Sequence, residues 1–100
     1  METYFIMGKF TQQGIQNIKQ TTERADRFKE IAAQFGITVK DIYWLIGDYD
    51  VVNIVEAPDD KALQALLVHV GAWGNVRTTT LRAFGKSEMG AVLEKMDGAQ

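Results

Sequence analysis

The stretch Ile46-Gly47-Asp48-Tyr49-Asp50-Val51 decides the fold of this chain, because it places a Gly/Asp turn between two apolar runs. Glycine supplies a positive φ in tight turns, and aspartate bonds nearby backbone amides there. The run before the turn, residues 38–46, and the run after it, residues 51–57, are rich in β-branched and aromatic side chains. The stretch therefore predicts a β-hairpin.

Working outward from this hairpin, the pattern predicts elements in the order β-α-β-β-α-β plus a terminal helix. Two segments carry apolar residues at helical spacing, i, i+3, i+4 and i+7, which is typical of helices with one buried face. The remaining expected elements are a strand over residues 3–10, a helix from Thr21 or Thr22 to Gly36, a helix from Asp59 or Asp60 to Gly71, a strand over residues 75–84 and a short C-terminal helix capped by Ser87.

This order predicts an α+β fold. Right-handed crossovers place both main helices on the same face of a four-stranded antiparallel sheet, which is the ferredoxin-like split βαβ plan. At 100 residues, the chain has length for one domain and no second core, so residues 1–100 are expected to form a single domain.

The second face of this sheet is expected to be apolar as well. An antiparallel sheet that is wet on one face alternates apolar and polar residues, whereas here large apolar residues lie on both sides: Ile42 and Trp44 against Tyr43, and Val52 and Ile54 against Val51 and Val55. A bare face of this kind exceeds what a soluble monomer usually exposes. We therefore expect a two-fold homodimer that packs sheet against sheet and buries roughly 800 Å² per chain.

Two segments resemble the GYD domain family, which is named for a G-x-Y-D signature. Residues 47–60, beginning Gly47-Asp48-Tyr49-Asp50 and ending Pro58-Asp59-Asp60, match the signature region, and residues 74–84 are similar to the other recurrent stretch of the family. The resemblance spans about residues 3–88 and implies a ferredoxin-like fold that assembles as a dimeric α+β barrel, without implying an activity. A weaker likeness connects the hairpin and the later Thr-rich strand to the ligand-binding domain of Lrp/AsnC-type regulators, in which small effectors bind between chains.

Composition excludes several classes of site. The net charge of −2 and a pI near 5.3 argue against nucleic acid as a partner. With no Cys and one His, no metal site and no cofactor are expected. No apolar run approaches the ~20 residues of a membrane span, and no secretory signal is visible, so we expect a cytoplasmic protein without membrane contact.

The strand over residues 75–84 is the most promising place for a ligand. Alternation puts Thr78, Thr80 and Arg82 on one face, while Leu81 and Ala83 suit the face that the helices cover. The polar side chains should then point into the space between two sheets, together with Asn53. An apolar pocket with a few convergent polar groups is typical of a small-ligand site.

Each of these residues also has a structural interpretation. Arg82 is suited to a ligand carboxylate, and equally to an ion pair with an Asp or Glu of either chain. Tyr43, Trp44 and Trp73 are candidates to line the pocket, although large aromatic residues more often anchor cores and interfaces. The signature residues Gly47, Tyr49 and Asp50 are candidates to close over a ligand, but turn geometry alone accounts for them.

Three functions remain open from the sequence. The first is a homodimeric module that binds a small organic ligand in a pocket between its sheets. The second, by analogy of fold alone, is a cofactor-free monooxygenase or isomerase that uses Tyr43, Tyr4 or Asp41. The third is a structural or partner-binding module that uses the amphipathic C-terminal helix as a contact.

Overall fold

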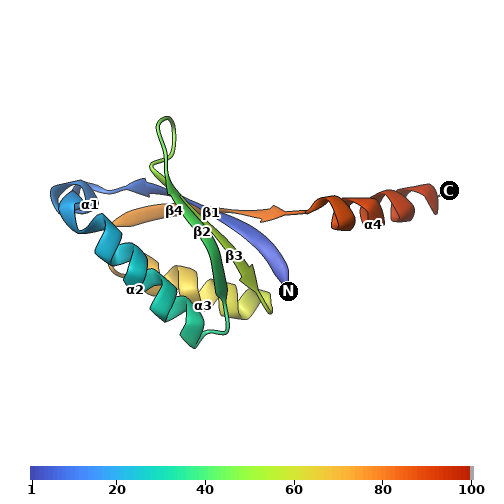
Figure 1. Cartoon of the computed structure of the whole chain (residues 1–100), viewed down its shortest axis with the longest axis horizontal. Helices are drawn as coiled ribbons and strands as arrows, with labels where there is room; N and C mark the ends of the chain where they lie inside the picture. The colour runs from blue at the N-terminus through green and yellow to red at the C-terminus, as the bar shows by residue number, and fades with distance from the viewer. Residues whose placement is uncertain (100) are drawn as a thin grey trace.

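The computed structural model describes residues 1–99 as one α+β unit with a helix that projects from it (Figure 1). Its elements are β1 (Glu2–Phe10), α1 (Gln12–Gln16), a 3-10 turn (Ile18–Gln20), α2 (Thr21–Gln34), β2 (Thr38–Trp44), β3 (Val51–Ala57), α3 (Asp60–Gly71), β4 (Val76–Ala83) and α4 (Lys86–Asp97). No helix within residues 1–99 combines the length and the apolar character needed to cross a bilayer.

The four strands form one antiparallel sheet in the order β2-β3-β1-β4. Helices α2 and α3 lie side by side on one face of this sheet, and α1 lies at one end of it (Figure 1). The predicted ferredoxin-like split βαβ plan is therefore confirmed. The other face, which we call the open face, is covered by no helix within residues 1–99.

The core lies between the sheet and helices α2 and α3. Phe28 and Ala32 of α2 are buried there, as the helical spacing predicts. Leu63, Leu66 and Val70 of α3 are buried against the sheet in the same way, and the largest fully buried side chains are Ile6, Val55 and Leu66. Burying a side chain of this size contributes about 1.5–3 kcal/mol, so this single layer carries most of the stability of the domain.

The predicted helix starts are partly right. Asp59 caps α3, with its carboxylate accepting from the Ala62 amide at 2.8 Å. The Thr21/Thr22 cap is wrong, because the residue before α2 is Gln20 and its side chain makes no capping bond. Ser87 is also not a cap: α4 begins at Lys86, and the Glu88 carboxylate accepts from the Gly85 amide at 3.5 Å.

The register of the strands fixes which side chains share a face. Ile6 of β1 is buried under the helices and lies opposite Asn53 of β3 and Thr80 of β4. Because directly paired residues point to the same face, Asn53, Thr78, Thr80 and Arg82 all point toward the helix layer.

The sequence-based orientation of the fourth strand is therefore wrong. Leu81 pairs with Phe5 on the open face and is 50% exposed, and Ala83 lies on the same side. The sheet places polar residues under the helices at this point because β4 is an edge strand, away from the centre of the core. The polar cluster predicted between two sheets thus lies between sheet and helices.

The hairpin loop is tied to β1 by Asp50. Gly47 has a φ of 132°, which confirms the predicted need for glycine in the turn. The Asp50 carboxylate accepts from the Phe10 amide at 2.8 Å, and the Asp50 amide donates to the Gly8 carbonyl at 2.8 Å. Tyr49 packs under the Lys9 ammonium, 5.4 Å from its ring centre. These signature residues therefore hold the loop in place.

One irregularity interrupts β2. The register shifts between Val39 and Asp41, so Lys40 has no paired residue on β3. This β-bulge lets Val39 face the helices while Asp41 faces the open side. The Lys40 ammonium lies 3.5 Å from the Glu56 carboxylate of the neighbouring strand.

Candidate functional site

A cavity lies between the sheet and the N-terminal half of α2, and α3 closes it on the other side. Its lining is mainly apolar and includes Ile6, Phe28, Val51, Leu67 and Val70. It offers about 60 Å³ to the centres of water-sized molecules. Since one water needs about 10–15 Å³ by this measure, the cavity has room for several waters or for one small organic molecule.

Four of the seven side chains predicted as ligand contacts line this cavity. Asn53 and Thr78 reach it from the sheet, Trp44 from the end of β2, and Trp73 from the loop after α3. The cavity thus brings together residues from sequence positions 44 to 78, although on the face of the sheet opposite to the one expected.

The other three candidates lie elsewhere. Thr80 faces the helix layer beside Ile6 but does not line the cavity. Arg82 points the same way and is held at the end of the sheet. Tyr43 pairs with Val52 on the open face, where it is exposed.

Asn53 and Thr78 bring unused hydrogen-bonding groups to this apolar cavity. Trp44 Nε1–H donates to Thr21 Oγ1 at 3.0 Å, so these two polar groups satisfy each other. Arg24 donates to the Asn17 carbonyl at 2.7 Å. Within residues 1–99, by contrast, the side chains of Asn53 and Thr78 form no hydrogen bond to protein. Their polar atoms are therefore free to bind water or a ligand.

Trp73 forms one end of the cavity and is held by its surroundings. The Arg27 guanidinium lies 5.0 Å from its ring centre, and the His69 ring meets it edge-on at 5.6 Å. Gln13 Nε2 donates to the Trp73 carbonyl at 2.8 Å, and Gly74 has a φ of 80°. These contacts fix the indole rather than leaving it free to swing between its flanking glycines.

Sequence reasoning missed Gly8, Thr21, Arg24 and Asn75, which also line the cavity. Gly8 carried a usable signal, because a glycine within a strand of large residues marks a place where another group approaches closely or where space remains. A Cβ added at Gly8 would lie 2.9 Å from Val51 Cγ1. The other three carried no signal, since polar residues at helix starts and loop ends are usually solvated.

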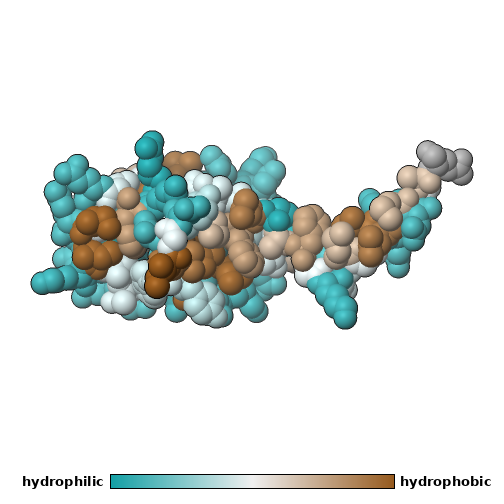
Figure 2. Space-filling model, turned by 90° about the horizontal axis from the view of Figure 1, so that it is seen from above, coloured by the Kyte–Doolittle hydropathy of each residue, from teal (hydrophilic) through white to brown (hydrophobic). Residues whose placement is uncertain are grey.

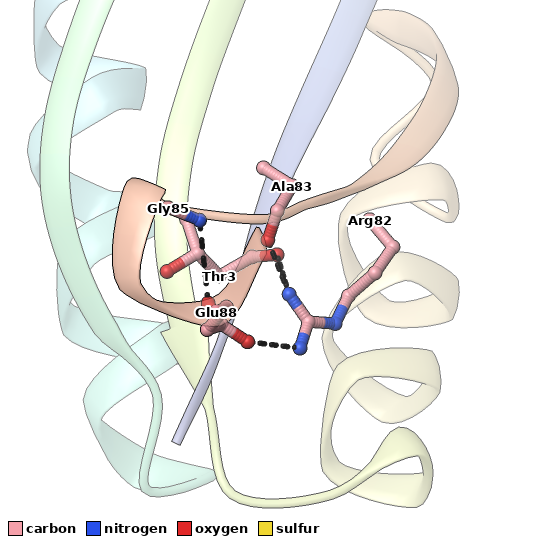
Figure 3. A network of polar contacts seen from close by, with 5 residues as sticks. All are labelled: Thr3, Arg82, Ala83, Gly85 and Glu88. Atoms are coloured by element: carbon pink, nitrogen blue, oxygen red, sulfur yellow. Dashed lines mark hydrogen bonds and ion pairs between the residues drawn. The ribbon is translucent and has the colours of Figure 1, made fainter. Parts of the chain in front are cut away.

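Arg82 forms an ion pair within its own chain (Figure 3). Its Nη2 lies 2.7 Å from Glu88 Oε2, and its Nη1 donates to the carbonyl groups of Thr3 and Ala83. The guanidinium also packs over the Phe84 ring at 4.3 Å. Of the two interpretations of Arg82, the structure shows the ion pair, so its donors are already engaged.

The Arg82 hydrogen bond lowers the pKa of Glu88 below its ordinary value. Because the carboxyl pKa is lowered, the ion pair contributes its full share of the free energy of unfolding at any pH above the ordinary pKa of glutamate. Its contribution is lost only when the pH falls through the lowered pKa. The junction between β4 and α4 is thus held throughout the neutral range.

The residues considered for proton transfer do not converge on the cavity. Tyr43 Oη–H donates to the Asp41 carboxylate at 3.1 Å on the open face, and this bond raises the pKa of Tyr43. Tyr4 lies under the Arg82 guanidinium, 5.7 Å from its ring centre. Within residues 1–99, no three His, Asp or Glu side chains are placed to hold a metal ion.

The open face carries a broad apolar surface. Phe5, Met7, Ile54 and Leu81 share it by register and are partly or half exposed, whereas Val52 on the same face is buried. Figure 2 looks onto the molecule from this side, and apolar surface there extends across the neck onto α4. The hairpin loop rises on the same side of the sheet (Figure 1).

Comparison with known proteins identifies relatives of the whole domain. A family model described as the GYD domain matches residues 4–93. The "Glutamine synthetase and cystathionine beta-lyase binding protein" of Thermus thermophilus is 30% identical over 95 residues, covering 94% of this chain and 100% of that protein.

Two solved structures share the fold. The crystal structure of MtbAldR has a TM-score of 0.67 at 20% identity, and the match covers 85% of this chain and 52% of MtbAldR, so this chain spans about half of that protein. A crystal structure of a Thermus thermophilus protein has a TM-score of 0.54 at 25% identity, covering 85% of this chain and 95% of that one.

Proposed function

Since this chain belongs to the GYD domain family, we propose that it is a homodimeric binding module with one small-ligand site in each subunit. The site is the cavity between the helix layer and the sheet. The two subunits join through their open faces. Each ligand is small and mainly apolar and carries a hydrogen-bonding group.

The observation that carries this proposal is the pair Asn53 and Thr78. Both line a mainly apolar cavity, Asn53 as a half-buried and Thr78 as an exposed residue, and neither side chain bonds to protein within residues 1–99. An amide and a hydroxyl without partners beside apolar walls are the arrangement that fixes the orientation of a ligand in many pockets.

The size of the cavity limits the ligand. At about 60 Å³ it holds roughly four to six waters, which together fill about as much space as one small aromatic ring. A ring of six atoms with one hydroxyl fits this description, so phenol is a suitable probe. Toluene has the same shape without the hydroxyl.

The test is titration of isotope-labelled protein with phenol and toluene, followed by NMR. We expect phenol to shift the amide resonances of residues 53 and 78 and the indole resonances of Trp44 and Trp73. Asn53→Leu and Thr78→Val should each weaken phenol binding about 3- to 10-fold, the value of one hydrogen bond, and leave toluene binding unchanged.

Thr80→Val is the matched control, because Thr80 lies two residues along the same face of β4 and does not line the cavity. Phenol binding should be the same in this variant as in the original chain. Equal binding of phenol and toluene, or no shift at the cavity residues with either, would contradict the proposed site.

A second candidate function is binding of an enzyme partner through the hairpin tip. The name of the Thermus thermophilus relative describes that protein as binding glutamine synthetase and cystathionine beta-lyase. In this chain Ile46 is fully exposed and belongs to the loop between β2 and β3, which projects from the sheet (Figure 1). An isoleucine in such a position is suited to a pocket on another protein.

Sedimentation of the chain with purified glutamine synthetase of its own organism tests this candidate. If the tip is the contact, Ile46→Asp should weaken the complex at least about 10-fold. Val68→Asp, an equally drastic change at an exposed position on α3, should leave it intact. The proposed contact would be contradicted if the original chain formed no complex with glutamine synthetase. It would also be contradicted if both variants bound the enzyme with equal affinity.

A further inference from the structure

Helix α4 leaves the body of the domain and has no cover within residues 1–99. It continues from the end of β4 and points away from the sheet and from α2 and α3 (Figure 1). As a result the molecule measures 54 × 31 × 19 Å, which is long for a chain of this size. Surface that the body would bury therefore remains exposed along α4.

The exposed surface of α4 is an apolar stripe. Met89, Val92, Leu93 and Met96 follow the spacing i, i+3, i+4 and i+7, and each is between 39% and 62% exposed. A helix of 12 residues is marginal in water when nothing packs against it, and the glycine at position 90 weakens it further. The stripe thus requires a covering surface.

The base of α4 fixes its direction. Arg82 of β4 bonds Glu88 in the first turn of the helix (Figure 3). Phe84 packs under the same guanidinium. Glu88 also accepts from the Gly85 amide at the helix start. An arm held in one direction before binding loses less freedom when it docks than a mobile tail would lose.

The covering surface is best supplied by a second copy of this chain. Leu81 on the open face and Phe84 at the neck are both about half exposed, so the apolar surface of the sheet continues onto the arm (Figure 2). Any molecule that covers the open face therefore lies next to the stripe.

The area of the open face also favours a second copy of this chain as the molecule that covers the stripe. Four strands of about 7 residues give a footprint near 23 by 19 Å, or about 440 Å². A standard interface buries about 800 Å² per partner. The arm, about 18 Å long and 10 Å wide, adds a footprint of about 180 Å² and brings the total closer to that size.

We propose that α4 is an intersubunit arm, which lays the stripe of Met89, Val92, Leu93 and Met96 against the second subunit of the homodimer. The two arms are related by the two-fold axis, so each subunit gives one arm and receives one. This inference rests on the proposed dimer and adds a second contact to its sheet faces.

Sedimentation equilibrium over a dilution series tests the arm. Leu93→Lys should raise the dissociation constant of the dimer about 100-fold, because both copies lose a buried leucine. Ala91→Lys is the matched control: it introduces the same side chain on the opposite side of α4 and should change the constant less than about 3-fold.

A second measurement reports contact directly. The chain has no cysteine, so Lys95→Cys provides a single site for a spin label beside the stripe. This spin-labelled chain is mixed with a second chain that carries the isotope label and no spin label. If the arm contacts the second chain, the spin label should broaden amide resonances of the isotope-labelled chain.

The outcomes separate the arm from the dimer. A dimer whose affinity is unchanged by Leu93→Lys, with no intermolecular broadening, overturns the arm and leaves the sheet-face dimer standing. An original chain that sediments as a monomer at every dilution overturns both.

Discussion

Replacing Leu81 by lysine is expected to separate the proposed homodimer into folded subunits. Leu81 lies near the neck on the open face, beside Phe5 in register, and half of its surface is exposed in the single chain. The lysine is therefore compatible with the fold of one subunit. In a two-fold interface the change occurs twice, which removes two buried leucines and brings in two charges. The dissociation constant should rise at least 100-fold, or roughly 3 kcal/mol.

The control for this variant is Val68→Lys. Val68 is 60% exposed on α3, on the side of the molecule away from the open face, so the same new charge enters an apolar surface position. Sedimentation equilibrium should give the original dimer for Val68→Lys and monomers for Leu81→Lys. Equal affinity for both variants would show that the open face is not the interface.

Gly14→Ala is expected to produce the largest loss of stability among the changes considered. Gly14 is buried in α1, and a Cβ at this position would lie 2.1 Å from the carbonyl oxygen of Asn75. That oxygen already accepts from the Thr11 amide at 3.0 Å, so it has no free direction in which to move. The free energy of unfolding should fall by about 3 kcal/mol, which lowers Tm by about 12 °C or more.

Gly90→Ala is the control, and its expected effect on stability is the opposite of that of Gly14→Ala. Nothing lies within 4 Å of a Cβ at position 90, which is inside α4, and alanine favours a helix there by about 1 kcal/mol. Thermal unfolding at one fixed protein concentration should show a lower Tm for Gly14→Ala and an equal or higher Tm for Gly90→Ala. An unchanged Tm in Gly14→Ala would contradict the close packing of α1 against the start of β4.

Because Asn75 also lines the cavity, Gly14→Ala connects stability to the proposed site. A shift of the Asn75 backbone moves the end of the cavity near Trp73. We therefore expect weaker phenol binding in this variant as well, under conditions where it remains folded.

The order of the strands and the positions of α2, α3 and α4 could be predicted from the sequence because each of these helices shows one apolar stripe, which the short α1 does not. In α2 and α3 the periodic residues leave a single interpretation, and the side chains that they mark are buried or half-buried. The hairpin turn was equally clear, since its glycine has the positive φ that the turn requires. Local patterns of this kind contain the information that determines local structure.

The orientation of the sheet could not be predicted in this way. In β3 both faces are apolar, with Val51 and Val55 on one side and Val52 and Ile54 on the other, so alternation does not indicate which face meets the helices. Only the pairing with the buried Ile6 settles it. The polar residues were thus correctly assigned to one common face, but that face was assigned to the wrong side, and of these residues only Asn53 and Thr78 line the cavity.

The ion-pair partner of Arg82 also could not be predicted from sequence patterns. Glu88 is only six residues away, yet the bond depends on the angle at which α4 leaves β4. That angle is a property of the folded neck around Phe84 and Gly85, for which the sequence carries no periodic signal.

The bulge at Lys40 has a consequence for how far this protein can assemble. β2 is an outer strand, and its free edge would offer unpaired amides to any passing extended chain. The extra residue at position 40 interrupts the regular pairing of that strand and kinks its edge. Edge-to-edge pairing of β2 with a strand of another molecule, which would extend the sheet into a fibre, is thereby disfavoured. Molecules that meet face to face can then form a closed pair without spreading into an aggregate.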